Sequence, residues 1–131
     1  MASVAGAIAR NVGLDLMKHS DNVIIENGGD IFLKLMNRDA IVGIFAGDSP
    51  LSYNVSIRIK CNGTPAGACT SSVTAESTAL ADAAATAVCN RVKRAGDIKE
   101  ALDFGLRVEG VEGALIIIGD KLGILGNIEL A

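Results

Sequence analysis

Aromatic residues are scarce in this sequence, which has three phenylalanines, one tyrosine and no tryptophan among 131 residues. Half of the residues are nevertheless hydrophobic, and alanine and glycine contribute 19 and 15 residues to the chain. A hydrophobic core must therefore be built from small and branched aliphatic side chains, with backbones packed close together.

Other scarcities exclude whole classes of protein. No hydrophobic run approaches the roughly 18 residues of a transmembrane helix, and the first residues lack the basic start of a secretory signal peptide. The net charge of −3 lacks the basic excess that is typical of nucleic-acid-binding proteins. A mean hydropathy of +0.40 with 21% charged residues argues against disorder. We therefore expect one globular domain over residues 1–131, with neither a membrane nor a nucleic acid as partner.

Cysteine and histidine are also too few for the common metal and nucleophile motifs. Cys61, Cys69 and Cys89 form neither a CxxC zinc pattern nor an even-numbered disulfide framework. We interpret each as a small core residue of a protein in a reducing cytoplasm. His19 is the only histidine and follows the first predicted helix, which favours a role at the helix C-terminus over a Ser-His-Asp triad.

Hydrophobic periodicity predicts the order of the elements. Val4, Ile8, Val12 and Leu16 recur at helical spacing, which predicts a helix over residues 2–18, and residues 77–93 form the strongest predicted helix, capped by Ser77 or Thr78. A shorter helix is expected over 97–106 and a loop over 61–72. Strands are expected over residues 23–26, 31–36, 40–46, 53–60, 111–119 and 124–130, with a short strand allowed over 73–76. Strands in runs joined by short turns predict an α+β fold, with a mainly antiparallel sheet and helices packed on one face.

Asp82 and Thr86 are the first candidates for chemistry, because an i,i+4 spacing places both oxygens on one face of the alanine-rich helix. One carboxylate and one hydroxyl suit Mg²⁺, which completes its coordination shell with water and ligand phosphates. The alternative is structural: Asp82 would interact with the N-terminus of this helix and Thr86 would hydrogen-bond to the backbone.

Two loops are the remaining candidates, and both have ordinary structural alternatives. In Asn27-Gly28-Gly29-Asp30 the paired glycines allow close approach of a ligand, and Asp30 could accept hydrogen bonds from it. The same residues are typical of a hairpin turn. The small-residue loop that ends in Thr70-Ser71-Ser72 offers backbone and hydroxyl donors to an anion, although it matches no Walker A or GxGxxG motif.

These segments, taken in order along the chain, resemble the uncharacterised ApbE-like protein family. The segments are MASVAGAIARNVGLDLM, VIIENGGDIFL, CTSS, STALADAAATAVCNRVK and GALIIIGDKLG. The family is similar to the FAD:protein FMN transferases (thiamine-biosynthesis-lipoprotein-like proteins), which also carry a GGD turn and an ADAxAT helix. The resemblance implies a T-fold-like architecture and covers nearly the whole chain.

The resemblance also implies a role for each candidate. It assigns Asp82 and Thr86 to a Mg²⁺ ion beside the FAD pyrophosphate. It assigns the turn of Asn27, Gly28, Gly29 and Asp30, and the loop of Thr70, Ser71 and Ser72, to the flavin nucleotide. The implied cofactors are FAD and Mg²⁺, and the implied partners are a flavin nucleotide and an acceptor protein.

Three departures from the family pattern shape the expectations. Met1 resembles an internal methionine, so we expect this chain to be the C-terminal portion of a longer protein. Family members have about a dozen further residues where Ser72 runs directly into Val73, so we expect a missing loop there. The transferases have a Lys-Gly pair in the first helix, whereas this chain has Val4-Ala5-Gly6-Ala7.

Two functions therefore stay open at this point. The first is a flavin-nucleotide-binding protein with Mg²⁺-dependent FMN transfer or FAD pyrophosphate cleavage, for which no catalytic base is identified. The second is a non-catalytic ligand-binding scaffold or a homo-oligomer. A weaker third hypothesis gives Cys69 a role in sulfur or redox chemistry.

Overall fold

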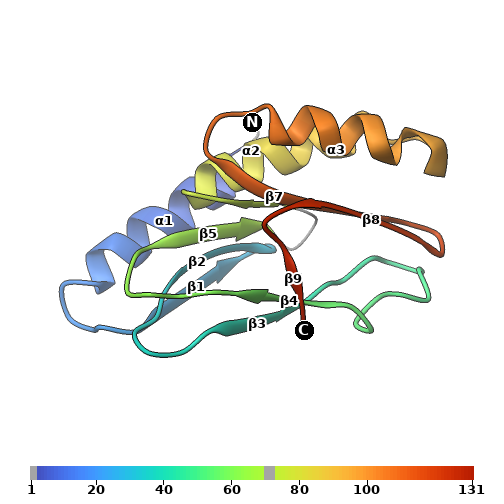
Figure 1. Ribbon diagram of the computed structural model, residues 1–131. Coiled ribbons are helices and arrows are strands. Elements are labelled where there is room, and N and C mark those ends of the chain that lie inside the picture. Colours follow the sequence, from blue (N-terminus) through green and yellow to red (C-terminus); the bar gives the residue numbers. More distant parts are fainter. Residues whose placement is uncertain (1–2, 70–72) are drawn as a thin grey trace.

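A computed structural model describes residues 3–69 and 73–131. The protein has three layers, in which helices cover one face of a six-stranded sheet and a three-stranded sheet covers the other face (Figure 1). The helices are α1 (Val4–Leu16), α2 (Thr78–Cys89) and α3 (Ile98–Leu106), with a short 3-10 turn η1 (Ala95–Asp97) before α3. All strand pairs within the described ranges are antiparallel. The predicted α+β fold with helices on one face is confirmed.

The large sheet has the order β1-β2-β5-β6-β7-β8. Its strands are β1 (Val23–Asn27), β2 (Asp30–Lys34), β5 (Ala66–Cys69), β6 (Val73–Ala75), β7 (Val111–Ile118) and β8 (Lys121–Gly126). The small sheet contains β3 (Ala40–Gly43), β4 (Ser56–Ile59) and β9 (Glu129–Leu130), in that order.

Three hydrophobic clusters fill the spaces between the layers of the described chain, and Phe32 is buried in the smallest, under α1. The composition of the other two follows the scarcity of aromatic residues. Under α2 and α3 the core consists mostly of alanine and valine side chains, with Ala81, Ala85 and Ala114 almost inaccessible to solvent. Between the two sheets it contains larger aliphatics such as Leu33 and Leu115. The helices therefore lie closer to the sheet than bulky side chains would permit.

Residues 61–72 were expected to form a loop, and this prediction is wrong for β5. The residues of β5 are small, and Gly67 lies directly below the first turn of α2. A Cβ atom on Gly67 would lie only 2.2 Å from the backbone nitrogen of Thr78. The strand contains glycine because the helix leaves no room for a side chain, so its composition resembles that of a loop.

The first helix also differs from its sequence pattern. Its apolar stripe faces solvent, with Val4 and Ile8 about half exposed. The helix packs instead through Gly6, Ala9 and Gly13. A Cβ atom on Gly13 would overlap the ring of Phe32, so the close approach of this strand residue depends on glycine.

Other boundaries differ by a few residues. The predicted strand over residues 53–60 begins only at Ser56, and Tyr53 lies outside it with a positive φ of 59° and 73% exposure. Ile57 and Ile59 are buried, as the alternation indicated. The predicted strand over 124–130 is divided between β8 and β9, because Gly126 adopts a positive φ that ends β8.

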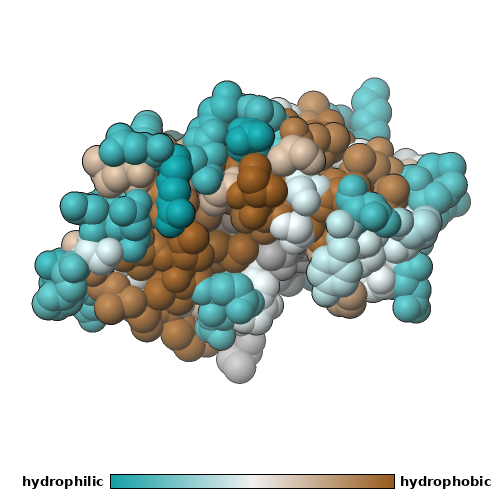
Figure 2. All heavy atoms as spheres, turned by 90° about the horizontal axis from the view of Figure 1, so that it is seen from below, coloured by the Kyte–Doolittle hydropathy of each residue, from teal (hydrophilic) through white to brown (hydrophobic). Residues whose placement is uncertain are grey.

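The face opposite the helices carries hydrophobic surface, gathered mainly on one side of the view from below (Figure 2). Exposed aliphatic residues on the strands include Ile24 on β1, Ile41 on β3 and Leu130 on β9. The candidate site described next lies against α2, on the other side of the large sheet.

Candidate functional site

The Asn27–Asp30 segment is a two-residue hairpin turn between β1 and β2. Asn27 and Asp30 are register partners, and the intervening Gly28 and Gly29 have φ values of 64° and 96°. Positive φ at both positions is the requirement of a type I′ turn, which glycine meets without strain. The turn places Asp30 as the first residue of β2, where its side chain faces the helices.

Hydrogen bonds hold this turn in place. The Asn27 Nδ2 donates to the Ala5 carbonyl in α1 over 3.1 Å, and the Gly29 N–H donates to Glu26 Oε1 over 2.6 Å. No heavy atom lies within 4 Å of the position that a Cβ atom on Gly28 would occupy. The turn is therefore fixed from one side and open on the other.

Asp82 lies on α2 where this helix crosses the first turn of α1. Its Oδ2 accepts a hydrogen bond from the Gly6 N–H over 3.1 Å. The crossing is close, because a Cβ atom on Gly6 would lie 2.5 Å from the Thr78 carbonyl oxygen. Asp82 thus stabilises the N-terminus of α1. The structural alternative had placed this carboxylate at the N-terminus of its own helix, so the role is of the expected kind but serves a different helix.

Thr86 lies one turn further along α2, and its Oγ1 donates to the Asp82 carbonyl over 3.1 Å. This is the backbone hydrogen bond that the structural alternative predicted. The hydroxyl donates its only hydrogen to this bond, but the lone pairs of its oxygen remain available to a cation. The observed bond is therefore compatible with a metal-binding role.

A cleft of about 330 Å³ between the hairpin turn and α2 brings four of the candidates together. Gly28 and Asp30 line it from the hairpin, and Asp82 and Thr86 line it from the helix. The cleft is also lined by Cys69, Ala85, Cys89 and Asn90. Asn27 and Gly29 support the turn without lining the cleft, and Thr70, Ser71 and Ser72 lie outside the described residues.

Asp30 has the most unusual environment in the cleft. Its side chain is buried, with the residue 5% exposed, and its Oδ1 has no hydrogen-bond partner within the described part of the chain. Burial raises the pKa of Asp30, and the nearby Asp82 and Glu26 carboxylates raise it further. A hydrogen bond with the Cys69 side chain opposes this shift. A buried carboxyl group next to a second one favours either a proton or a bound cation.

The cleft has oxygen ligands but no complete metal cage. Across residues 3–69 and 73–131, no three histidine, cysteine, aspartate or glutamate side chains converge as they would around a bound ion. Two carboxylates, a hydroxyl and the Asn90 amide are the hard ligands that suit Mg²⁺, which normally keeps waters and takes further oxygens from a substrate phosphate. The donor set fits such an ion better than a cation that the protein must enclose completely.

Ala85, Cys89 and Asn90 line the cleft but were not among the sequence-based candidates, and Cys69 was considered only for sulfur or redox chemistry. Cys69 was interpreted as a core residue and is indeed buried, but Cys89 is exposed, so its interpretation as a core residue is wrong. Cys89 and Asn90 follow Asp82 by two helical turns. Extending the helical spacing beyond Thr86 would have placed them on the same face.

A second cavity lies between the two sheets and has a volume of about 210 Å³. Its two cationic side chains are already paired: Arg58 Nε and Lys60 Nζ lie 3.1 and 3.0 Å from the Glu129 carboxylate. None of the motif residues that the structure describes lines this cavity. His19 lines neither cavity and is exposed just beyond α1.

Comparison with known proteins gives a consistent family relationship. Residues 1–130 match the family model described as AbpE bacteria. A UPF0280 protein of Methanocaldococcus jannaschii is 38% identical over 149 residues, covering 98% of this chain and 60% of the relative. UPF0280 proteins of Methanothermobacter thermautotrophicus and Methanopyrus kandleri are each 37% identical, with 98% and 97% of this chain covered and 57% and 59% of the relative.

The chain spans about 60% of the length of these curated relatives. The alignment with the Methanocaldococcus jannaschii protein is longer than the chain, so this relative has residues within the matched region that the chain lacks. The loop expected between Ser72 and Val73 stays a prediction, because Ser72 lies outside the described residues. No helix among the described residues has the length and hydrophobicity to cross a membrane.

Proposed function

The chain belongs to the AbpE bacteria family, and from this premise we propose that it binds a flavin nucleotide, FAD, in the cleft between the hairpin turn and α2. Asp82 and Thr86 would hold Mg²⁺ beside the pyrophosphate of the nucleotide. The observation that carries the proposal is the buried Asp30 carboxyl group, whose Oδ1 lacks a partner among the described residues.

Each part of the cleft has a distinct task in this proposal. The open side of Gly28 lets the nucleotide approach the backbone of the turn, since no neighbouring atom occupies the space where a side chain would be. The Thr86 hydroxyl keeps its lone pairs for a cation. Asp82 is fixed by the Gly6 N–H through Oδ2, which directs its carboxylate without saturating it.

Catalysis would cleave the pyrophosphate bond of FAD. When bound, Mg²⁺ would polarise a phosphoryl oxygen and stabilise the charge that develops as FMN and AMP separate. The FMN phosphoryl group would pass to a protein hydroxyl in a transferase or to water in a pyrophosphatase. The acceptor protein is part of the proposal as well.

The second candidate function is a ligand-binding or self-associating scaffold without catalysis. Two observations favour it: the first helix has Val4-Ala5-Gly6-Ala7 where the transferases carry a lysine, and the apolar stripe of this helix faces solvent. A scaffold of this kind would retain the nucleotide unchanged.

The test combines binding with product analysis. FAD affinity is measured by quenching of flavin fluorescence with Mg²⁺ present, and AMP is quantified after incubation. We expect FAD binding, and an Asp82→Asn variant that binds at least about tenfold more weakly because one carboxylate ligand is lost. Asp103→Asn, on the neighbouring helix α3 and away from the cleft, is the matched control.

The outcomes separate the two functions. AMP release supports the enzyme, whereas bound FAD without AMP supports the scaffold. Unchanged FAD affinity in Asp82→Asn would contradict the role of this carboxylate in binding.

A further inference from the structure

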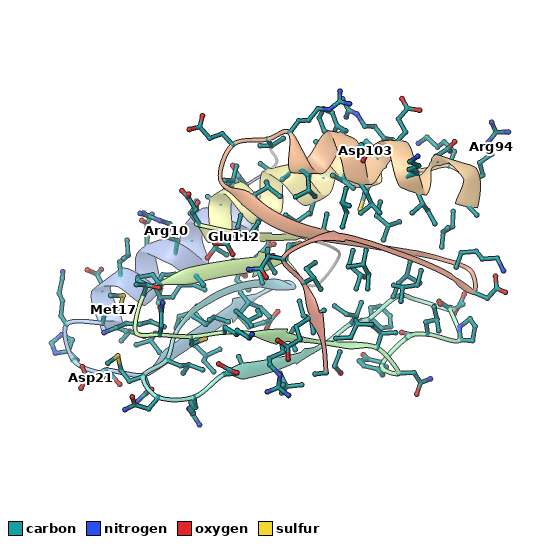
Figure 3. All side chains as sticks on the ribbon, in the orientation of Figure 1. Arg10, Met17, Asp21, Arg94, Asp103 and Glu112 are labelled. Carbon is teal, nitrogen blue, oxygen red and sulfur yellow. The ribbon has the colours of Figure 1, made fainter. Side chains whose placement is uncertain are left out.

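Two acidic side chains share the cleft, and no cationic side chain among the described residues lines it. The carboxyl groups of Asp30 and Asp82 both line it and influence one another directly. The described lining residues include no lysine, arginine or histidine. Arg10 and Arg94 lie on opposite sides of the helical layer and point outward (Figure 3).

The end of α2 adds to this field. Cys89 is the last residue of the helix and Asn90 is its C-cap, and both line the cleft. The C-terminus of a helix carries a partial negative charge, because its last carbonyl groups have no partners within the helix. At this end of α2 the Arg91 Nη1 donates to the Ala87 carbonyl over 2.9 Å, which offsets part of the charge. Two carboxyl groups and a helix C-terminus therefore face the same small volume.

Binding of a pyrophosphate group in this cleft is unfavourable without a cation, because phosphate oxygens and carboxylates repel one another. A divalent cation removes this conflict, since it binds both kinds of oxygen. The buried Oδ1 of Asp30 has no hydrogen-bond partner among the described residues, so we assign it as a ligand atom for such a cation.

We propose that Asp30 is a second carboxylate ligand beside Asp82 for a hard divalent cation, and that the cation must occupy the cleft for a phosphate group to bind. The inference rests on the proposed function and makes it more specific: the site recognises the Mg²⁺ complex of a nucleotide and excludes the free nucleotide. The sequence had placed Asp30 at the nucleotide itself, so the role as a metal ligand is new.

The first experiment measures the cation alone. Mn²⁺ is titrated into nucleotide-free protein, and the free ion is followed by electron paramagnetic resonance. We expect one bound Mn²⁺ in the original protein and in Asp103→Asn. In Asp30→Asn we expect at least about tenfold weaker binding, because the neutral amide supplies one charge less. Equal Mn²⁺ affinity in Asp30→Asn, or no Mn²⁺ binding by the original protein, overturns the inference.

Folding of the variant is checked independently. Asparagine has nearly the same shape as aspartate and removes the repulsion with Asp82, so we expect Asp30→Asn without metal to melt no lower than the original protein. Added Mg²⁺ should raise the melting temperature of the original protein but not that of the variant. An equal Mg²⁺ shift in both proteins counts against Asp30 as a ligand.

The second experiment separates this inference from the proposed function. FAD affinity is measured with Mg²⁺ and with EDTA, and we expect a loss of at least about a hundredfold in EDTA. If FAD binds equally well in EDTA, the required cation is wrong while flavin binding stands. If Mn²⁺ binds through Asp30 but FAD binds under neither condition, the cation site stands and the flavin proposal fails.

Discussion

Gly67 is the residue through which β5 supports the first turn of α2, and replacing it with alanine tests the close packing of the helical layer. The new Cβ atom would lie 2.2 Å from the nitrogen of Thr78 and 2.3 Å from the carbonyl carbon of Ser77. Both are backbone atoms, so no side-chain rotation can relieve the overlap. The start of α2 must move away from the sheet.

The size of this effect follows from the distances. Carbon atoms in contact prefer separations of about 3.5–4.0 Å, so the helix must shift by more than about 1 Å. Overpacking of this kind costs about 1–3 kcal/mol. Alanine also restricts the unfolded chain, which restores about 0.4–1 kcal/mol. We expect a net loss of about 1–2 kcal/mol in the free energy of unfolding.

Urea denaturation followed by circular dichroism measures this change, with Gly43→Ala as the matched control. Gly43 also lies in a strand, but no atom lies within 4 Å of its added Cβ. We expect the control to stay within about 0.5 kcal/mol of the original protein. A Gly67→Ala protein as stable as the control would refute the packing argument, and with it the reason why β5 looks like a loop in the sequence.

Two further predictions concern hydrogen bonds to aspartate. Asp82→Ala should lower the free energy of unfolding by about 1 kcal/mol, because the Gly6 N–H loses its acceptor. Asp82→Asn should retain most of this stability, because the amide oxygen can still accept the bond. Equal urea midpoints for the two variants would contradict this role. Asp97 accepts hydrogen bonds from the backbone N–H groups of Lys93 and Arg94, which lower its pKa. Its ionised form therefore stabilises the folded state above about pH 4, and this stabilisation disappears as the pH falls through the lowered pKa. Asp97→Asn should melt below the original protein at pH 7, and the difference should shrink near pH 3; a difference independent of pH would contradict the assignment.

Much of the fold could be predicted from the sequence, because its main signals are local. Alternation over Ile57 and Ile59 and the Ser77 cap identified elements that the structure contains. The strand β5 could not be found this way, because its small residues reflect the close approach of α2, which local alternation does not encode. The apolar stripe of α1 has helical spacing, but spacing alone does not reveal which face of a helix the neighbouring layers cover.

The candidate site was predictable in a different way. The spacing of Asp82 and Thr86 predicts a shared helix face, but only the fold places Asp30 opposite them. Because Asp30 pairs with Cys69 across β2 and β5, this cysteine enters the same cleft. The position of Cys69 opposite Asp30 depends on the register between β2 and β5. This register could not be predicted, because β5 was expected to be a loop.

Two hydrogen bonds tie the start of α1 to the cleft, one from Gly6 to Asp82 and one from Asn27 to Ala5. Any ligand that repositions the Asp82 carboxylate must also act on this helix, whose outer side chains are exposed. A molecule that attached to α1 would therefore be thermodynamically linked to cleft occupancy. By reciprocity, whatever steadies the helix changes ligand affinity by the same factor by which the ligand changes that attachment.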